Sequence, residues 1–338
     1  MGDTSNNGKS SAHSVPIQYS SRLKRYSYTI LLMLVFTLTS NVSAKDSNIL
    51  ILLSGNNNVY LDVATTITNS TIKMCRDWGL ACQDANYEIS QISSQHNHFS
   101  HDHRVIVTLG IKAAAFAKKH FSSNHIFSAL IPKISRIKSS SLGDNENHYL
   151  LYLDQPLYRS MLLINALSDG FKNIGVMISS SDNDSEEILT RAASDLDMIL
   201  NIERVDNADQ IGTSLNRLLD NSDILLALPD IKIHNKTTVS NILISAYRKR
   251  IPLIGFSSAY VKAGALAAIY SSHEDIAFHV RDNIVSVYSG ETIENREQNP
   301  AYFSILFNSE VARSLDFPTK SVLELENTII KRSKDSDD

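Results

Sequence analysis

Short apolar runs alternate with segments of helical spacing along most of this chain. In the first hundred or so residues after position 47, apolar runs predict strands at 48–54, within 80–92, at 104–109 and at 126–131, and helical spacing predicts helices at 60–78 and 111–120. Alternating strands and helices indicate a parallel sheet, because parallel strands need a long crossover connection.

A second series of the same kind follows an extended run at 149–153 and the turn Asp154-Gln155-Pro156. It predicts helices at 157–168, 185–196, 208–220 and 237–250, and strands at 173–178, 199–205, 223–228, 251–256 and 264–270. The pattern therefore predicts an α/β fold with two Rossmann-like, doubly wound parallel-sheet lobes in series.

The order of these segments suggests how the chain is divided. We expect an N-terminal lobe from residues 45–152 plus 264–300, with the strand and helix at 265–289 rejoining it. We expect a C-terminal lobe from residues 153–263 plus 301–330. The charged residues 331–338 are expected to form a disordered tail.

The N-terminus has the pattern of a secretory signal peptide. Three basic residues precede a short apolar run, Tyr28–Thr37, and a small-x-small site ends at Ala44. The run is shorter than the roughly 20 residues that a membrane-spanning helix needs, although an uncleaved anchor remains the alternative. We therefore expect residues 1–44 to be removed after Ala44 and the protein to be periplasmic.

Composition narrows the possible partners. The net charge is −4, and hydrophobic and charged residues make up 43% and 20% of the chain, which is ordinary for a globular protein. Without an excess of basic residues, no nucleic-acid partner is expected.

Two cysteines, Cys75 and Cys82, lie seven residues apart. Gly79 is expected to end the helix that carries Cys75, so the chain reverses between the two residues. Export would place them where disulfides persist. A disulfide and two buried thiols are both compatible with this pattern.

Motifs for cofactor or covalent chemistry are missing. The chain has 12 glycines but no G-x-G-x-x-G, no phosphate-binding G-x-x-x-x-G-K-[ST], no G-x-S-x-G and no H-E-x-x-H. We therefore expect no cofactor and no enzymatic activity, but a protein that binds and closes.

Four histidines cluster just before a predicted strand: His96, His98, His101 and His103. Imidazoles suit zinc, copper or nickel, so a weak metal site is one interpretation. A polar surface loop is the other. The cluster lies at the amino end of its strand, whereas ligands of such sheets bind at the carboxyl ends, so we do not expect it to bind the principal ligand.

Candidate ligand-binding residues of the first lobe follow the predicted strands: Ser54, Gly55, Gly110, Ile111, Lys112 and Pro132. The turn at Gly110 opens a helix, whose free N–H groups favour an anion such as a carboxylate. Lys112 would either add a positive charge to this site or lie in solvent.

The matching candidates of the second lobe and of the passage between the lobes are Gln155, Ser179, Ser180, Asp230, Ser257 and Tyr260. Asp230 would hold a ligand ammonium or cap the helix that follows it. Tyr260 would stack on a ligand or pack in the core. Gln155 would face either the hinge or the cleft.

Four stretches resemble a known family: LYLDQPLYRSMLLINAL at 151–167, LLALPD at 225–230, NILISAYRKRIPLIGFSSAYVKAGALAAIYSS at 241–272 and NPAYFSILFNSEVARSLDF at 299–317. They are similar to the substrate-binding proteins of ABC transporters, in the branch with tryptophan- and tyrosine-binding members and the type I periplasmic-binding fold.

The resemblance implies two lobes joined by three crossings, with a small solute held in the cleft by hinge closure. Crossings are implied near Tyr152–Pro156, Tyr260–Gly264 and Asn299–Ser304. Ligand contacts are implied from the strand-end loops that carry the candidate residues above. This chain departs from the family in Ile111-Lys112, where small or hydroxyl residues are usual, and in its histidine loop.

We therefore expect an exported, monomeric solute-binding protein that captures a small polar or amino-acid-like ligand for an inner-membrane ABC permease. One alternative is a periplasmic sensory or accessory protein that presents its ligand to a receptor kinase or another uptake system. Weaker alternatives are a hydrolase or transferase on the same scaffold and a periplasmic metal buffer.

Overall fold

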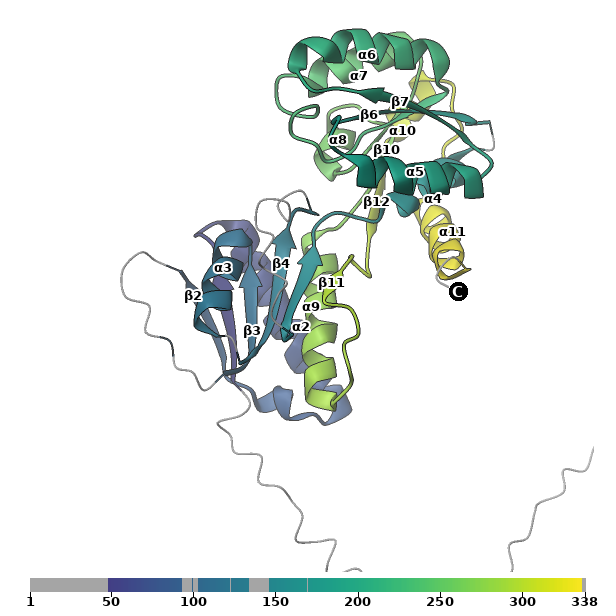
Figure 1. Cartoon of the computed structure of the whole chain (residues 1–338). Helices are drawn as coiled ribbons and strands as arrows, with labels where there is room; N and C mark the ends of the chain where they lie inside the picture. The colour runs from purple at the N-terminus through teal and green to yellow at the C-terminus, as the bar shows by residue number, and fades with distance from the viewer. Residues whose placement is uncertain are drawn as a thin grey trace, which may run out of the picture. The chain divides into compact units, whose positions relative to one another are not determined.

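The computed structural model describes residues 48–92, 99, 103–121, 123–133, 146–168 and 170–335. It contains two six-stranded sheets, each flanked by helices (Figure 1). The expected signal peptide and three of the four clustered histidines, His96, His98 and His101, lie outside the described residues. Within the described ranges, no helix has both the length and the apolar character to cross a bilayer.

The first sheet has the strand order β11-β5-β4-β3-β1-β2, and its neighbours pair in parallel. Its strands are β1 (Asn48–Leu53), β2 (Tyr87–Gln91), β3 (His103–Leu109), β4 (His125–Ile131), β5 (His148–Tyr152) and β11 (Glu297–Gln298). Helices α2 (Asn58–Trp78) and α9 (His273–Ser289) cover one face, and α3 (Ile111–His120) covers the other. Ile51 faces the first pair of helices and Leu52 faces α3, so β1 is apolar at successive positions.

The second sheet has the order β12-β10-β9-β8-β6-β7, with β12 antiparallel to β10 at one edge. Its strands are β6 (Asn173–Ile178), β7 (Ile199–Arg204), β8 (Ile224–Leu226), β9 (Leu253–Gly255), β10 (Ala267–Tyr270) and β12 (Ser304–Phe307). Together the two sheets confirm the predicted α/β fold with two doubly wound lobes.

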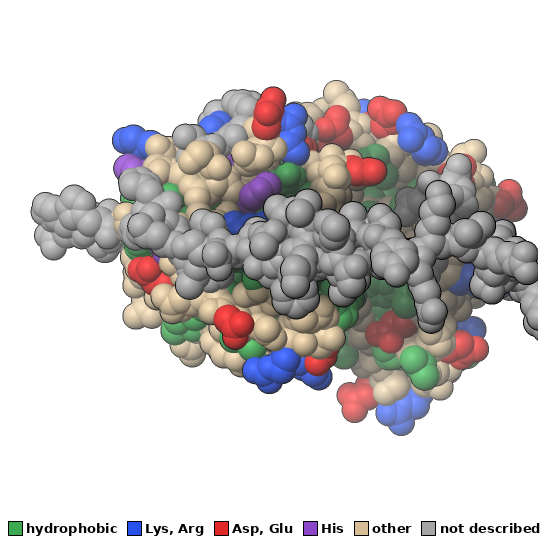
Figure 2. All heavy atoms as spheres, turned by 90° about the horizontal axis from the view of Figure 1, so that it is seen from below, with side chains coloured by type: hydrophobic (Ala, Val, Ile, Leu, Met, Phe, Trp, Pro, Cys, Tyr) green, Lys and Arg blue, Asp and Glu red, His purple; other side chains and the backbone are tan. Residues whose placement is uncertain are grey.

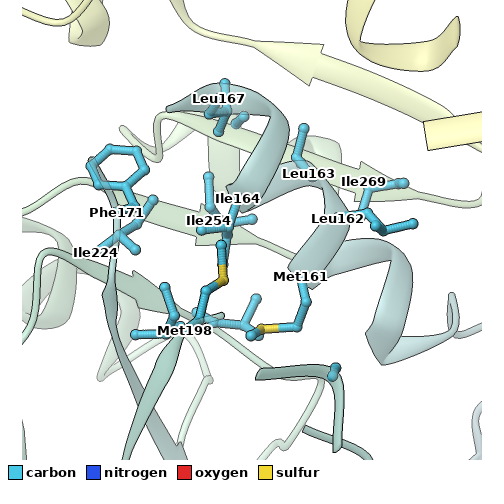
Figure 3. Close-up of a cluster of buried hydrophobic side chains, with 14 of the residues drawn as sticks. Met161, Leu162, Leu163, Ile164, Leu167, Phe171, Met198, Ile224, Ile254 and Ile269 are labelled. Carbon is cyan, nitrogen blue, oxygen red and sulfur yellow. The ribbon is translucent and has the colours of Figure 1, made fainter. Parts of the chain in front are cut away.

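Helices cover both faces of the second sheet as well. Its helices are α4 (Leu157–Leu167), α5 (Asn183–Asp195) and α11 (Val322–Asp335) on one face, α6 (Ala208–Asn221) and α7 (Val239–Arg248) on the other, and the short α8 (Ser258–Lys262) and α10 (Ser309–Ser314). Figure 3 shows the core on the α4 face, where Met161 and Ile164 pack with the strand residues Ile224 and Ile254.

The chain passes between the two sheets three times. The first crossing (residues 153–156) follows β5, the second (271–272) follows β10, and the third (299–303) follows β11. The first and third lie where the resemblance implies them. The second was expected near Tyr260–Gly264, and this was wrong, since Tyr260 lies in α8, inside the second lobe.

The strand after Gly264 was expected to rejoin the first lobe, and this was also wrong. β10 pairs in parallel with β9 and antiparallel with β12, both in the second sheet. Helix α8 provides the short crossover that two adjacent parallel strands need. Only α9, of the segment 265–289, packs on the first sheet.

Two shorter segments add to or differ from the expectation. The second strand was predicted within residues 80–92, and β2 lies there from Tyr87 to Gln91, after a 3-10 turn at Ala81–Asp84. The tail from 331 was expected to be disordered, but α11 continues to Asp335. Its side chains Leu325 and Ile329 are buried against the second-lobe core, which stabilises the helix.

The two cysteines form a disulfide, with their Cα atoms 5.6 Å apart. Gly79 ends α2 in the left-handed conformation, with φ 66°, so the chain turns back and brings Cys82 to Cys75. Both cysteines are completely buried and pack against Val285 of α9. The disulfide therefore fastens the end of α2 beneath α9.

Candidate ligand-binding site

The carboxyl edge of the first sheet is organised around Gly110. Its φ of 88° is in the region that favours glycine, and an added Cβ would lie 2.6 Å from the hydroxyl of Tyr60 and 2.7 Å from that of Ser54. The N–H of Gly110 donates to the carbonyl of Ala129 at 2.9 Å. Gly110 thus lets α3 begin in close contact with the end of β1.

The N-terminus of α3 is only partly satisfied. Ser54 Oγ accepts from the N–H of Ala113 at 2.9 Å, and the N–H of Ala114 donates to Gly110. Among the described residues, the N–H groups of Ile111 and Lys112 have no acceptor. Free N–H groups at a helix N-terminus attract an anion, so the predicted role of this turn has a geometric basis.

The side chains around this turn differ in character. Ile111 and Lys112 are exposed, whereas Gly55 and Pro132 are half-buried. Pro132 follows a bulge in β4, where the register shifts by one residue and Leu130 has a φ of 57°.

Two residues near this edge were missed by sequence reasoning. Leu130 gives no signal, because nothing in its neighbourhood predicts a left-handed leucine inside a strand. The hydroxyl of Tyr60 lies beside Gly110, and an aromatic residue in the first turn of the helix after Gly55 was an available signal.

The carboxyl edge of the second sheet carries a buried Ser–Asp pair, Ser179 and Asp230. Ser179 follows β6 and donates its hydroxyl hydrogen to Asp230 Oδ2. Asp230 is only 8% exposed, and its Oδ1 accepts from the N–H of Lys232 at 2.9 Å. Asp230 therefore caps the turn directly after it and not the helix α7, which begins at Val239, and its carboxylate keeps further acceptor capacity for a cation.

The neighbouring serines are more exposed. Ser180 donates to Asp206 Oδ2 at 2.8 Å on the surface, and Ser257 is half-buried at the start of α8. The second edge thus contains two Ser–Asp pairs, one buried and one exposed.

Tyr260 packs in the core, which was the second of its two interpretations. It is 4% exposed, and the Cβ of an added side chain at Gly255 would lie 2.4 Å from Tyr260 Cβ, so α8 lies directly on β9. Its hydroxyl is 2.6 Å from His234 Nδ1. Burial raises the pKa of Tyr260 and lowers the pKa of His234 to about 4, so both are neutral at pH 7.

Gln155 lies in the first crossing, and its side chain is hydrogen-bonded to the other two crossings. Its Nε2 donates to Ser271 Oγ at 2.9 Å and to the carbonyl of Tyr302 at 3.0 Å. Of the two alternatives for Gln155, these bonds favour the hinge.

The one described histidine of the cluster, His103, is largely buried at the start of β3, with Nε2 3.8 Å from Glu88 Oε2. It is a strand residue rather than a loop residue. Throughout the described ranges, no three His, Cys, Asp or Glu side chains are grouped as metal ligands.

A serine–histidine pair does occur in the first sheet. Ser128 Oγ lies 2.7 Å from His148 Nε2 and accepts from the hydroxyl of Thr108 at the same distance. All three side chains are completely buried, so a substrate cannot reach them. The pair has the geometry of a nucleophile and its base but not the accessibility that catalysis requires.

Charges on the described surface are mixed. On the face shown in Figure 2, acidic and basic side chains are interspersed, and the described residues form no continuous basic patch.

Solved structures show where this fold occurs. A ligand-free, open substrate-binding protein with adhesive properties from Clostridium difficile has a TM-score of 0.62 and 15% identity, and the match covers 81% of this chain and 96% of that one. An ABC domain in complex with L-Trp from Streptococcus pneumonia has a TM-score of 0.50 and 16% identity, with 82% and 98% covered. At these identities the similarity concerns the fold.

Sequence comparison identifies the family. No curated protein is significantly similar to the chain. The profile of the family described as "ABC transporter substrate binding protein" matches residues 72–328, which is most of the chain and includes the whole second sheet and every strand of the first sheet except β1. The chain therefore belongs to the ABC transporter substrate binding protein family.

Proposed function

We propose that this protein is exported to the periplasm and captures a small amino-acid-like solute for an inner-membrane ABC permease. Family membership supports the class of function. The observation that carries the ligand class is the opposite character of the two strand-end sites. The first offers the free N–H groups of Ile111 and Lys112, and the second offers the buried carboxylate of Asp230.

A solute with an anionic and a cationic end fits both sites. Its carboxylate would accept from the N-terminus of α3, next to the exposed ammonium of Lys112. Its ammonium would donate to Asp230, which Ser179 and the N–H of Lys232 hold in place. Closure of the lobes on a solute of this kind would bring both ends out of water and strengthen both contacts.

The exposed apolar side chains at these edges support a solute that is not purely polar. Ile111 is 37% exposed beside the first site and Ile231 is 74% exposed beside the second. An apolar group of the ligand would cover such side chains on closure. The L-Trp complex of the pneumococcal protein provides a first compound to try, because tryptophan has all three features.

We also propose that the protein is a binding protein and not an enzyme. Within the described part of the chain, the Ser128–His148 pair is the arrangement closest to a nucleophile with its base, and it is inaccessible. Capture without chemical change is the function that remains for the two strand-end sites.

The test begins with native mass spectrometry of the mature protein, followed by calorimetry with L-tryptophan and the other standard amino acids. Asp230→Asn is expected to weaken binding of an amino acid about tenfold to a hundredfold, because a charge-assisted hydrogen bond to the ammonium is lost. Asp206→Asn is the matched control, since Asp206 also accepts from a serine on the same edge but is exposed. Equal affinities of both variants and the wild type would remove Asp230 from the site.

A further inference from the structure

The three crossings are connected to one another through side chains. No backbone hydrogen bond of the described residues joins one crossing to another. Residues 153–156, 271–272 and 299–303 also belong to no helix or strand. The direct hydrogen bonds between the crossings therefore involve side chains, in addition to the strand pairs β5–β11 and β10–β12 that flank them.

Gln155 contacts all three segments. It lies in the first crossing, and its amide donates one hydrogen bond to Ser271 Oγ in the second and another to the carbonyl of Tyr302 in the third, at 2.9 and 3.0 Å. A side-chain amide has two N–H hydrogens, and these two bonds use both.

The remaining atom of the amide is also engaged. Arg159, in the first turn of α4, donates from Nη1 to Gln155 Oε1 at 2.8 Å and to the carbonyl of Pro300 at 2.5 Å. The guanidinium lies over the ring of Phe303 at 5.4 Å. Arg159 thus fixes the orientation of Gln155 and adds a second connection between the first and third crossings.

Ser271 completes the arrangement. Its hydroxyl accepts from Gln155 and donates to the carbonyl of Leu153 at 2.8 Å, so the first and second crossings are joined in both directions. The polar groups that connect the crossings are satisfied by one another. Such a network can hold only a small number of arrangements, because moving one segment breaks bonds to the other two.

We propose that Gln155 is the positioning residue that makes the three crossings move as one hinge, and that it thereby sets the balance between lobe arrangements. This role goes beyond solute capture at the strand ends and does not depend on the identity of the solute. It also reassigns Gln155, which was a ligand-contact candidate, because all three of its polar groups are used within the hinge.

The experiment measures the distance between the two lobes in the full chain without added ligand. Spin labels on Lys119→Cys in α3 and Asn216→Cys in α6 report the distance by double electron–electron resonance. Both positions are exposed, and the native cysteines are paired with each other, so labelling is specific. The distance distribution is recorded for the wild type, Gln155→Ala, Gln155→Glu and a control.

The control is Gln210→Ala. The side-chain amide of Gln210 is hydrogen-bonded as well, since its Oε1 accepts from the backbone N–H groups of Asp206 and Asn207, but it lies at the start of α6 and far from the crossings in sequence. It removes a comparable number of interactions without touching the hinge. Thermal melting of each variant verifies that it is folded.

Gln155→Ala is expected to change the population ratio of the lobe arrangements about fivefold, which is seen as a shift or a broadening of the distance distribution. This is the effect of losing about one net hydrogen bond that is present in only one arrangement. Gln155→Glu keeps the shape but cannot donate to Tyr302 or Ser271, so it should act in the same way. An unchanged distribution in both variants would overturn the proposal. An equal change in Gln210→Ala would overturn it as well, because the effect would then follow from general destabilisation.

Discussion

Two buried histidines, His148 and His234, are expected to make the stability of the protein depend on pH. Burial lowers the pKa of each to about 4, with the nearby positive charge of Lys118 acting in the same direction on His148 and the charge of Asp230 opposing the effect on His234. A pKa that is lowered on folding makes the unfolded chain bind the proton first.

Stability should therefore be complete above about pH 6.5 and fall as the pH decreases towards 4. By linkage, each buried histidine would contribute up to about 3 kcal/mol to this loss. Urea unfolding between pH 7.5 and 4.5 measures it. His148→Leu should flatten the profile and lower the stability at neutral pH, whereas the exposed His273→Asn should do neither. If the stability of the wild type did not change over this pH range, the two histidines would not be buried in their neutral form.

Two glycines in different environments, Gly110 at the start of α3 and Gly212 inside α6, test the geometry of these helices. Gly110→Ala should destabilise the protein by more than about 2 kcal/mol, because it combines a left-handed φ of 88° with contacts of 2.6 and 2.7 Å to two hydroxyl groups.

Gly212→Ala is the matched substitution in α6, where an added Cβ meets no atom within 4 Å. It should stabilise the protein by about 1 kcal/mol through helix propensity. Both values come from chemical unfolding at one pH. Equal effects of the two substitutions would mean that Gly110 is not packed closely against Ser54 and Tyr60.

At the scale of elements, periodicity predicted most of the strands and helices because buried parallel strands are continuous apolar runs. It did not locate the start of β2 within residues 80–92, because the short 3-10 turn of Ala81–Asp84 has no period of its own. It also could not assign β10 to a sheet. An apolar run such as Ala267–Tyr270 fits either core, and the choice depends on its pairing with β9 and β12.

The candidate site was predictable only as far as it depends on strand ends. Loop positions after strands pointed to Ser54, Gly110 and Asp230, and all three take part in polar networks there. The sequence could not tell that Tyr260 is buried, because an aromatic residue after a strand fits a core as well as a ligand. The bonds of Gln155 were also beyond prediction, since their partners lie more than 100 positions away.

At the scale of the whole molecule, neither lobe is continuous in sequence. The first lobe includes α9 and β11 from the last third of the chain, and the second lobe includes β12, which follows β11 in sequence. However, Tyr270 of β10 and Ser304 of β12 are register partners in an antiparallel pair. The two strands can thus be joined directly as a hairpin.

Replacing residues 271–303 with an Asn-Gly turn, in a chain of residues 156–335, should therefore give a second lobe that folds alone. The turn reproduces the connection that adjacent antiparallel strands prefer, and α11 is kept to cover α4. A cooperative urea transition and a compact elution volume are the expected readouts. Residues 156–270 alone, which lack β12 and α11, are the control and should not fold cooperatively. Failure of the joined chain as well would mean that the lobe needs the first sheet.

The disulfide between Cys75 and Cys82 has a consequence for the order of events during maturation. Both sulfur atoms are completely buried, and α9, which covers them, is synthesised about two hundred residues later. An oxidant can reach the two thiols only before α9 docks, so oxidation belongs to an early stage of folding. A chain that folds first would enclose two reduced thiols, and the rate of oxidation relative to docking decides which form of the molecule is made.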